Sequence, residues 1–259
     1  GAIGGIHTLS SLTNIDNYGA ITIDVRHEKA VYIHAAGVVG QMISYSTDEA
    51  NAPDVKVVTK CDNHGTVTTT VESTGHAAST YAGIAAVMTR GITNFSDNHN
   101  HGAITCNDHV AGRTIGGIVG SHSWSAITNC TNNAALTNNG NAGATKIGGI
   151  IGADILLSIT NCTNNGVVKN SGNLTGTNNF YIGGISGSDL LITHEDYTAY
   201  NFKQEDCHVT NCHNKAEIIN DGTGNSIFVA GIVARTTSAT INECTNTAAI
   251  KHIGISKAN

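Results

Sequence analysis

The sequence predicts an all-β fold, a single-stranded parallel β-helix of about seven rungs with three short strands in each rung. Three observations support this prediction. Helix-forming residues are scarce, and Gly, Asn and Thr are abundant, with 30 glycines in 259 residues. One pattern of roughly 32 to 50 residues recurs along the chain. Each copy contains three short apolar-alternating segments separated by Gly, Asn, Ser and Thr, which is typical of strands and turns.

The first part of each copy is a glycine followed by Ile or Val. The seven pairs are Gly5-Ile6, Gly37-Val38, Gly83-Ile84, Gly117-Ile118, Gly149-Ile150, Gly184-Ile185 and Gly231-Ile232. A glycine at one point of every rung indicates a backbone conformation or a close approach that a Cβ atom would prevent. We therefore expect a tight, repeated packing contact at this position.

The second part of each copy contains two further columns. The first comprises Ile15, Cys61, Phe95, Cys130, Cys162, Cys212 and Cys244. Two residues later in each copy stand Asn17, Asn63, Asp97, Asn132, Asn164, Asn214 and Asn246. Equivalent residues of neighbouring rungs lie about 4.8 Å apart, so stacked amides can form a hydrogen-bonded ladder.

The cysteine column has the character of an apolar core position, because it also holds Ile and Phe. We expect buried, mostly reduced thiols there. Cys130 and Cys162 lie on neighbouring rungs at a distance compatible with a bridge, but in-register stacking gives poor disulfide geometry. The chain contains no CxxC pair that would indicate structural zinc.

One copy of the pattern cannot bury its own apolar face, so the copies must stack as a solenoid. We expect residues 1–259 to form one β-helix domain, a segment of a longer protein. Strand crossovers overwhelmingly turn to the right, which favours a right-handed winding. Two insertions interrupt the pattern, at residues 41–54 and 188–208.

The composition argues against two classes of partner. The net charge is −6, and the 13 Lys and Arg residues are scattered, so we expect no nucleic-acid binding. No apolar run approaches the roughly 20 residues of a membrane helix, so we expect no membrane insertion. No cofactor is expected.

Both insertions leave the same predicted corner, four rungs or roughly 19 Å apart. Between them, short corners would form the floor of a trough carrying Arg90, His122, Trp124 and Asp154. The walls would carry Tyr45, Asp48, Glu49, His194, Glu195, Asp196, Tyr197 and Tyr200. Aromatic rings and carboxylates suit a carbohydrate ligand, and solvated loops without a ligand are the simpler interpretation. The predicted ligand-binding residues are Trp124, His122, Arg90, Asp154, Tyr45, Tyr197 and Tyr200.

Catalysis is the alternative interpretation of this corner. A glycosidase needs two carboxylates about 5–5.5 Å or about 6.5–9.5 Å apart, and Asp154 with Glu195 or Asp196 are the candidates. A lyase would need Lys or Arg nearby, and these residues are sparse. We therefore predict no catalytic residues, with a polysaccharide-degrading enzyme as the alternative.

The stretch from Asp97 to Gly102, DNHNHG, raises the question of a metal site. His64 lies in the matching turn of the previous rung, so His64, His99 and His101 are the candidate ligands. Turn imidazoles are more often solvated or stacked, and no acidic second shell is evident. We therefore predict no metal.

The recurring words "IGGIVG", "IGGIIG" and "IGGISG", with the "TNC-x-N" turns, resemble the GLUG-type repeats of bacterial surface proteins. The resemblance covers Ile3 to Lys251. It implies a β-helical repeat in an extracellular, bacterial cell-surface setting. Such repeats also occur in IgA-specific metallopeptidases, but the zinc motif HExxH is absent here.

These observations favour a non-catalytic scaffold or adhesin-like module. Its expected partners are a carbohydrate or host surface ligand and the other domains of the parent protein. A spacer with no ligand of its own is the third alternative.

Overall fold

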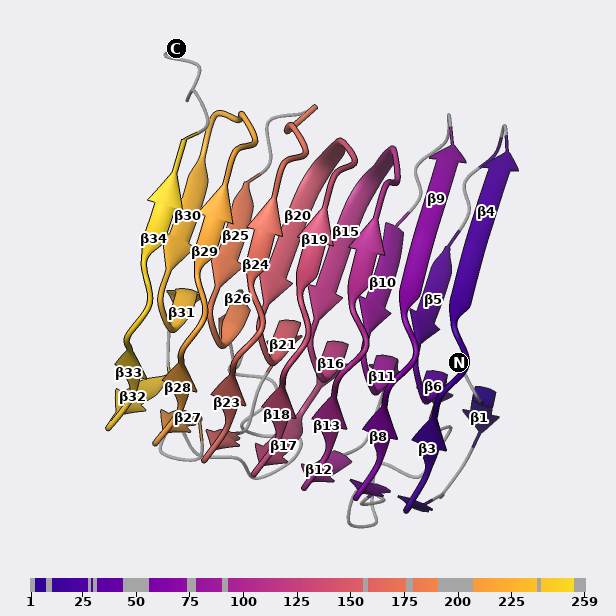
Figure 1. Cartoon of the computed structure of the whole chain (residues 1–259), viewed down its shortest axis with the longest axis vertical. Helices are drawn as coiled ribbons and strands as arrows, with labels where there is room; N and C mark the ends of the chain where they lie inside the picture. Colours follow the sequence, from indigo (N-terminus) through magenta and orange to yellow (C-terminus); the bar gives the residue numbers. More distant parts are fainter. Residues whose placement is uncertain are drawn as a thin grey trace, which may run out of the picture.

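The computed structural model describes residues 3–7, 11–27, 29, 32–43, 56–73, 78–89, 93–155, 158–175, 179–190, 207–236 and 239–253. Within these residues it contains strands β1 to β34 and no helix. All strand pairs are parallel, and they form five sheets of six or seven strands, which we call sheets A to E. Figure 1 shows the rungs in sequence order, from β4 in indigo to β34 in yellow. The parallel β-helix is thereby confirmed.

Sheets A and B are consecutive along the chain. Sheet A contains β1 (Ile3–His7), β6 (Val39–Ile43), β11 (Ala85–Thr89), β16 (Val119–Ser123), β21 (Ile151–Ile155), β26 (Ser186–Leu190) and β31 (Val233–Thr236). Sheet B contains β2 (Ser11–Thr13), β7 (Lys56–Thr59), β12 (Thr93–Ser96), β17 (Ser125–Thr128), β22 (Ser158–Thr160), β27 (His208–Thr210) and β32 (Thr240–Asn242).

Sheet C is made of two-residue strands. They are β3 (Asp16–Asn17), β8 (Asp62–Asn63), β13 (His99–Asn100), β18 (Thr131–Asn132), β23 (Thr163–Asn164), β28 (His213–Asn214) and β33 (Thr245–Asn246). Sheet D contains β4 (Ile21–His27), β9 (Val67–Ser73), β14 (Ile104–Cys106), β19 (Leu136–Asn138), β24 (Val168–Asn170), β29 (Ile218–Asn220) and β34 (Ile250–His252).

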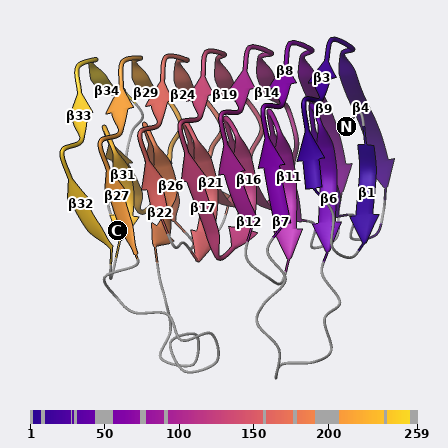
Figure 2. The ribbon, with the colours of Figure 1, turned by 90° about the horizontal axis from the view of Figure 1, so that it is seen from below.

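Sheet E completes the rung. It contains β5 (Ile33–Ala36), β10 (Ala78–Ala82), β15 (Val110–Gly116), β20 (Ala142–Gly148), β25 (Phe180–Gly183) and β30 (Ile227–Ala230). A complete rung therefore has five strands rather than the predicted three. The sequence pattern did not separate sheets E and A, which meet at the glycine corner, and it counted the short strands of sheet C as turns. Figure 2 shows the solenoid from below.

The strand register corrects the predicted alignment in two copies. Gly5 pairs with Gln41 rather than with Gly37, because Ile3 pairs with Val39. In the third copy, Phe95 pairs with Val58 and Ile127 in sheet B, outside the cysteine column.

Asn98 and Asn100 hold the positions that we had predicted for Phe95 and Asp97. Asn100 pairs with Asn63 and Asn132 in sheet C, so Asn98, two residues earlier, occupies the cysteine column. Asn98 is fully buried, and its amide bonds to the backbone of Val58 and Cys61 at 2.9 Å. This position therefore accepts a polar side chain that has hydrogen-bond partners.

The predicted asparagine ladder is present through sheet C. The Nδ2 atom of each asparagine donates to the Oδ1 atom of its counterpart in the next rung, at 2.6–2.8 Å. The ladder comprises Asn17, Asn63, Asn100, Asn132, Asn164, Asn214 and Asn246. Every bond runs in the same sense, from the N-terminal rung to the C-terminal one.

The corner between sheets E and A presses against this ladder. A Cβ atom added to Gly37, Gly83, Gly117, Gly149, Gly184 or Gly231 would lie 2.1–2.6 Å from the Cγ atom of a ladder asparagine. This confirms the predicted close approach at these six glycines.

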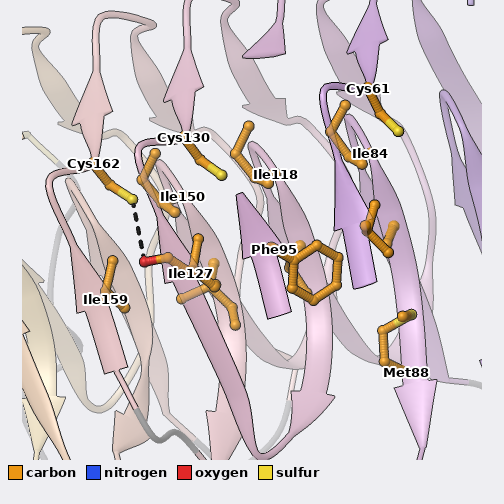
Figure 3. Packing of buried hydrophobic residues seen from close by; sticks show 14 of the residues in the cluster. Cys61, Ile84, Met88, Phe95, Ile118, Ile127, Cys130, Ile150, Ile159 and Cys162 are labelled. Atoms are coloured by element: carbon orange, nitrogen blue, oxygen red, sulfur yellow. Dashed lines mark hydrogen bonds between the residues drawn. The ribbon is translucent and has the colours of Figure 1, made fainter. Parts of the chain in front are cut away.

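The contact between the glycine corner and the ladder divides the interior into two apolar lobes. One lobe lies inside sheets A and B. Its core includes Ile118, Ile127, Cys61, Cys130, Cys162, Cys207 and Cys212. The other lies inside sheets D and E, and its core includes Ile115 and Leu136. Figure 3 shows the columns of the first lobe, with Phe95, Ile127 and Ile159 in line.

Candidate functional site

Both predicted insertions begin at the end of a sheet A strand and lead to sheet B. The first lies between β6 and β7, and the second between β26 and β27. Strands β6 and β26 are four positions apart in sheet A. The described ends of both insertions therefore lie at one corner, four rungs apart. Of the predicted insertions, 41–54 and 188–208, residues 41–43 and 188–190 end β6 and β26, and His208 begins β27. Residues 44–54 and 191–206 are outside the described residues.

Most of the predicted trough residues cannot be placed, because they lie in these segments or, for Arg90, in residues 90–92, which are also outside the described residues. Those outside the described residues are Tyr45, Asp48, Glu49, Arg90, His194, Glu195, Asp196, Tyr197 and Tyr200. His122 and Trp124 are described with their side chains. Asp154 is described by its backbone, which pairs in register with His122 of the preceding rung.

His122 belongs to the interior of the first lobe. It shares a column with Met42 and Met88, which are both buried, and its own residue is only 3 % exposed. Its ring meets Phe95 edge to face, with centroids 6.1 Å apart. Its Nε2 atom lies 2.9 Å from the Thr93 hydroxyl. The imidazole is thus held inside the wall of the corner rather than on an open floor.

Trp124 lies at the turn between β16 and β17. It is 9 % exposed, and its φ angle of 64° is in the left-handed region, which a bulky side chain rarely adopts. The Trp124 backbone thus keeps an uncommon conformation while its indole is buried. The ring therefore offers little of its face to a ligand from solvent.

The three candidate metal ligands have a different arrangement. The rings of His64 and His101 stack with centroids 4.9 Å apart and an interplanar angle of 3°, and Tyr18 stacks on His64 at 4.6 Å. His99 is tilted by 46° from His101 at 6.3 Å. In a parallel stack the ring nitrogens point along parallel planes rather than toward a common point. No group of three His, Cys, Asp or Glu side chains suited to a metal ion occurs among the described residues.

The cysteines are all free thiols, and six of the seven are buried. The Sγ atom of Cys162 lies 3.6 Å from the carbonyl oxygen of Ile127 in the preceding rung (Figure 3). Burial raises the pKa of Cys61, Cys162 and Cys244. The pKa of Cys212 is lowered, chiefly by its hydrogen bond with Cys162. Most of the column is therefore protonated and unreactive at neutral pH.

Two charged residues that the sequence pattern did not single out occupy the second lobe. The side chains of Asp108 and Arg113 are fully buried and form an ion pair, with Arg113 Nε 3.6 Å from Asp108 Oδ2. Arg113 stands in the column of Ser79 and Thr145. The one feature of the sequence that indicates Arg113 is a single charged residue at an inward-facing position of a strand.

No family model matches the chain, and no curated protein or solved structure matches it. The structure defines the class of protein, a parallel β-helix solenoid with an internal amide ladder. Among the described residues, no helix is long and apolar enough to cross a membrane.

Proposed function

We propose that this protein is a non-catalytic extracellular scaffold, an adhesin-like repeat module of a bacterial cell surface. One observation supports it above all. A continuous hydrogen-bonded amide ladder runs through all seven strands of sheet C, alongside sheets that pair in register from one rung to the next. Such an array has repeated nearest-neighbour contacts and gives a stiff, extended support. The resemblance to GLUG-type repeats supports the surface setting.

We place the ligand site of this scaffold at the corner between sheets A and B. The ligand is a glycan, because the insertions carry tyrosines and carboxylates, which supply flat apolar faces and hydrogen-bond acceptors for hydroxyl groups. In this proposal, Tyr45, Tyr197 and Tyr200 contact the sugar. Trp124 and His122, which are buried, hold the corner between the insertions in place.

A glycan array tests the binding part of the proposal. The wild type should bind a defined set of glycans, and Tyr197→Ala with Tyr200→Ala should weaken binding at least tenfold. Tyr18→Ala is the matched control, because Tyr18 is 72 % exposed on a different part of the solenoid. Equal loss in the control, or no binding by the wild type, would remove the glycan site and leave a spacer.

Turnover assays test the non-catalytic part. Incubation with plant, host and microbial polysaccharides should release no reducing ends and no unsaturated products. Release that disappears in Asp154→Asn, Glu195→Gln or Asp196→Asn would instead establish a polysaccharide-degrading enzyme.

A further inference from the structure

A polar cluster lies inside the second lobe, around the Asp108–Arg113 ion pair. Both side chains are fully buried. Asp108 Oδ1 accepts a hydrogen bond from the Thr69 hydroxyl at 2.9 Å, and Arg113 donates to the Gly140 carbonyl at 2.9 Å and to the Asp108 carbonyl. The two opposite charges cancel, so the cluster as a whole is neutral.

Arg113 also ends a second asparagine ladder, in sheet D. Asn138 Nδ2 donates to Asn170, Asn170 Nδ2 donates to Asn220, each at 2.6 Å, and Asn220 Nδ2 lies 2.9 Å from His252 Nδ1. Before Asn138 the column holds Cys106, which has no amide to continue the ladder. The guanidinium group of Arg113 donates to Asn138 Oδ1 in its place. The cluster therefore lies at the change from an apolar column to an amide column.

Several buried polar atoms of the cluster make no direct hydrogen bond: Ser79 Oγ, Tyr81 Oη, Asp108 Oδ2, Arg113 Nε and Thr145 Oγ1. Some of them face one another at longer range, since Arg113 Nε lies 3.6 Å from Asp108 Oδ2 and Tyr81 interacts with Asp108 and Ser79. The strand register brings them together, because Ser79 and Thr145 lie on either side of Arg113 in neighbouring strands of sheet E. Tyr81 is two residues from Ser79 on the same inward face. Burial, followed by the Asp108 charge, raises the pKa of Tyr81, which keeps its hydroxyl protonated.

A buried polar atom that makes no direct hydrogen bond loses the water that it bonded in the unfolded chain, and this loss destabilises the fold. Buried polar groups in folded proteins are otherwise satisfied by protein or by ordered water. Hydroxyl and guanidinium groups supply the donors, and Asp108 Oδ2 together with the hydroxyl oxygens supplies the acceptors. A ligand that both donates and accepts is required, and a neutral cluster does not select a charged one.

We propose that this cluster is an internal binding site for ordered water. At least one water molecule bridges the Asp108 carboxylate and Arg113 Nε to the hydroxyl groups of Ser79, Tyr81 and Thr145. Buried waters typically make about three hydrogen bonds to otherwise unsatisfied groups, which this set supplies. The interior of the second lobe is therefore hydrated at the rungs where the sheet D ladder begins.

Thr145→Val distinguishes a hydrated site from a dry one. The substitution removes a hydroxyl and keeps the shape of the side chain. If the hydroxyl bonds a water, the unfolding equilibrium constant should rise roughly tenfold. If the site is dry, loss of an unmatched hydroxyl should leave the constant unchanged or lower it. Thr105→Val is the matched control, because Thr105 lies on the outward face of β14 and should change the constant less than twofold.

The wild-type protein gives a direct readout that does not depend on any variant. A high-resolution crystal structure should show a density peak within hydrogen-bond distance of at least two of the five atoms. Absence of such a peak together with a neutral or stabilising Thr145→Val would overturn the proposal. A peak with the scattering and coordination of an ion would also overturn it.

Discussion

A side chain on Gly149 would overlap the side chain of Asn164. A Cβ atom added to Gly149 would lie 2.4 Å from Asn164 Cγ and 2.0 Å from the carbonyl oxygen of Gly184. The asparagine is a member of the sheet C ladder, and the glycine belongs to the corner between sheets E and A. The two residues therefore lie in contact at the boundary between the lobes. The asparagine leaves no room for a side chain at the glycine, and the glycine leaves the space that the asparagine fills.

We predict that Gly149→Ala destabilises the protein by about 1–3 kcal/mol, because the new methyl group must displace the ladder or the backbone. Denaturant unfolding followed by circular dichroism measures this. Gly112→Ala is the control, because a Cβ atom at Gly112 would meet nothing within 4 Å. It should be neutral or slightly stabilising. Equal effects of the two substitutions would contradict the packing argument.

Loss of a central ladder residue should cost more than loss of a surface asparagine. Asn132→Ala removes the acceptor of Asn100 Nδ2 and the amide that donates to Asn164 Oδ1, which then keeps only the longer bond from the Gly166 N–H. We expect a loss of at least about 2 kcal/mol in the free energy of unfolding. Asn133→Ala, one residue away and exposed, should cost less than about 0.5 kcal/mol. If the ladder contributed nothing to stability, the two variants would have the same free energy of unfolding.

Lys60 occupies a left-handed corner that does not suit a lysine, and Glu243 occupies the equivalent corner of the last rung. Lys60 has a φ of 53°, and the equivalent positions in four rungs hold Asn14, Asn129, Asn161 and Asn211. Asparagine tolerates this conformation better than lysine. Lys60→Asn should therefore raise the free energy of unfolding by up to about 1 kcal/mol. Asn161→Val, which places a β-branched residue at such a corner, should lower it, and a gain from this change would refute the interpretation.

The thiols should react in order of their exposure. Alkylation of the native protein at pH 8 should modify Cys244 first, because it is the one partly exposed cysteine of the seven, which all lie in the described residues. Its raised pKa keeps even this reaction slower than that of a free thiol. Mass spectrometry of digested samples follows each site. Cys244→Ser should abolish the fast phase, and rapid labelling of several sites would show that the column is not closed.

Alkaline pH should destabilise the fold through Cys106. Burial raises the pKa of this thiol from 9.0 to about 12. Between these values the unfolded chain releases the proton and the folded protein keeps it, so the stability contribution present below pH 9 is lost as the pH rises. The free energy of unfolding should fall up to about 1.4 kcal/mol per pH unit more steeply than in Cys106→Ser. Parallel curves for the two proteins would show that the thiol is hydrated.

The sequence was sufficient for the solenoid because stacking repeats the same chemistry at every rung. The ladder at Asn132 and the close approach at Gly117 both follow from a column of identical residues. The third copy misled the alignment, because Phe95 is as apolar as Cys130 and Asp97 resembles an asparagine. The left-handed corner at Asp97, equivalent to Lys60 and Asn129, sets the register there, and no residue type specifies that corner uniquely.

The candidate site was harder to predict than the fold. His122 and Trp124 interrupt the pattern, and polar or aromatic interruptions are typical of function. Trp124 lies at a corner, where the strand period stops, and His122 lies near the end of β16, so the pattern did not indicate burial for either, and both are interior. Asp108 and Arg113 present the reverse case, because charged residues are expected at the surface. The two residues lie only five positions apart in the chain, but nothing in the sequence indicates that both charged side chains are buried in the core.

The shared direction of the sheet C amides limits how the length of this solenoid can change. Each asparagine donates a hydrogen bond to the asparagine of the following rung. A longer or shorter protein therefore keeps the ladder continuous only if it gains or loses complete rungs. A partial turn would set an asparagine beneath a cysteine and a glycine beneath a bulky residue. The length of the solenoid can therefore change only in steps of about 4.8 Å, which is the spacing between rungs.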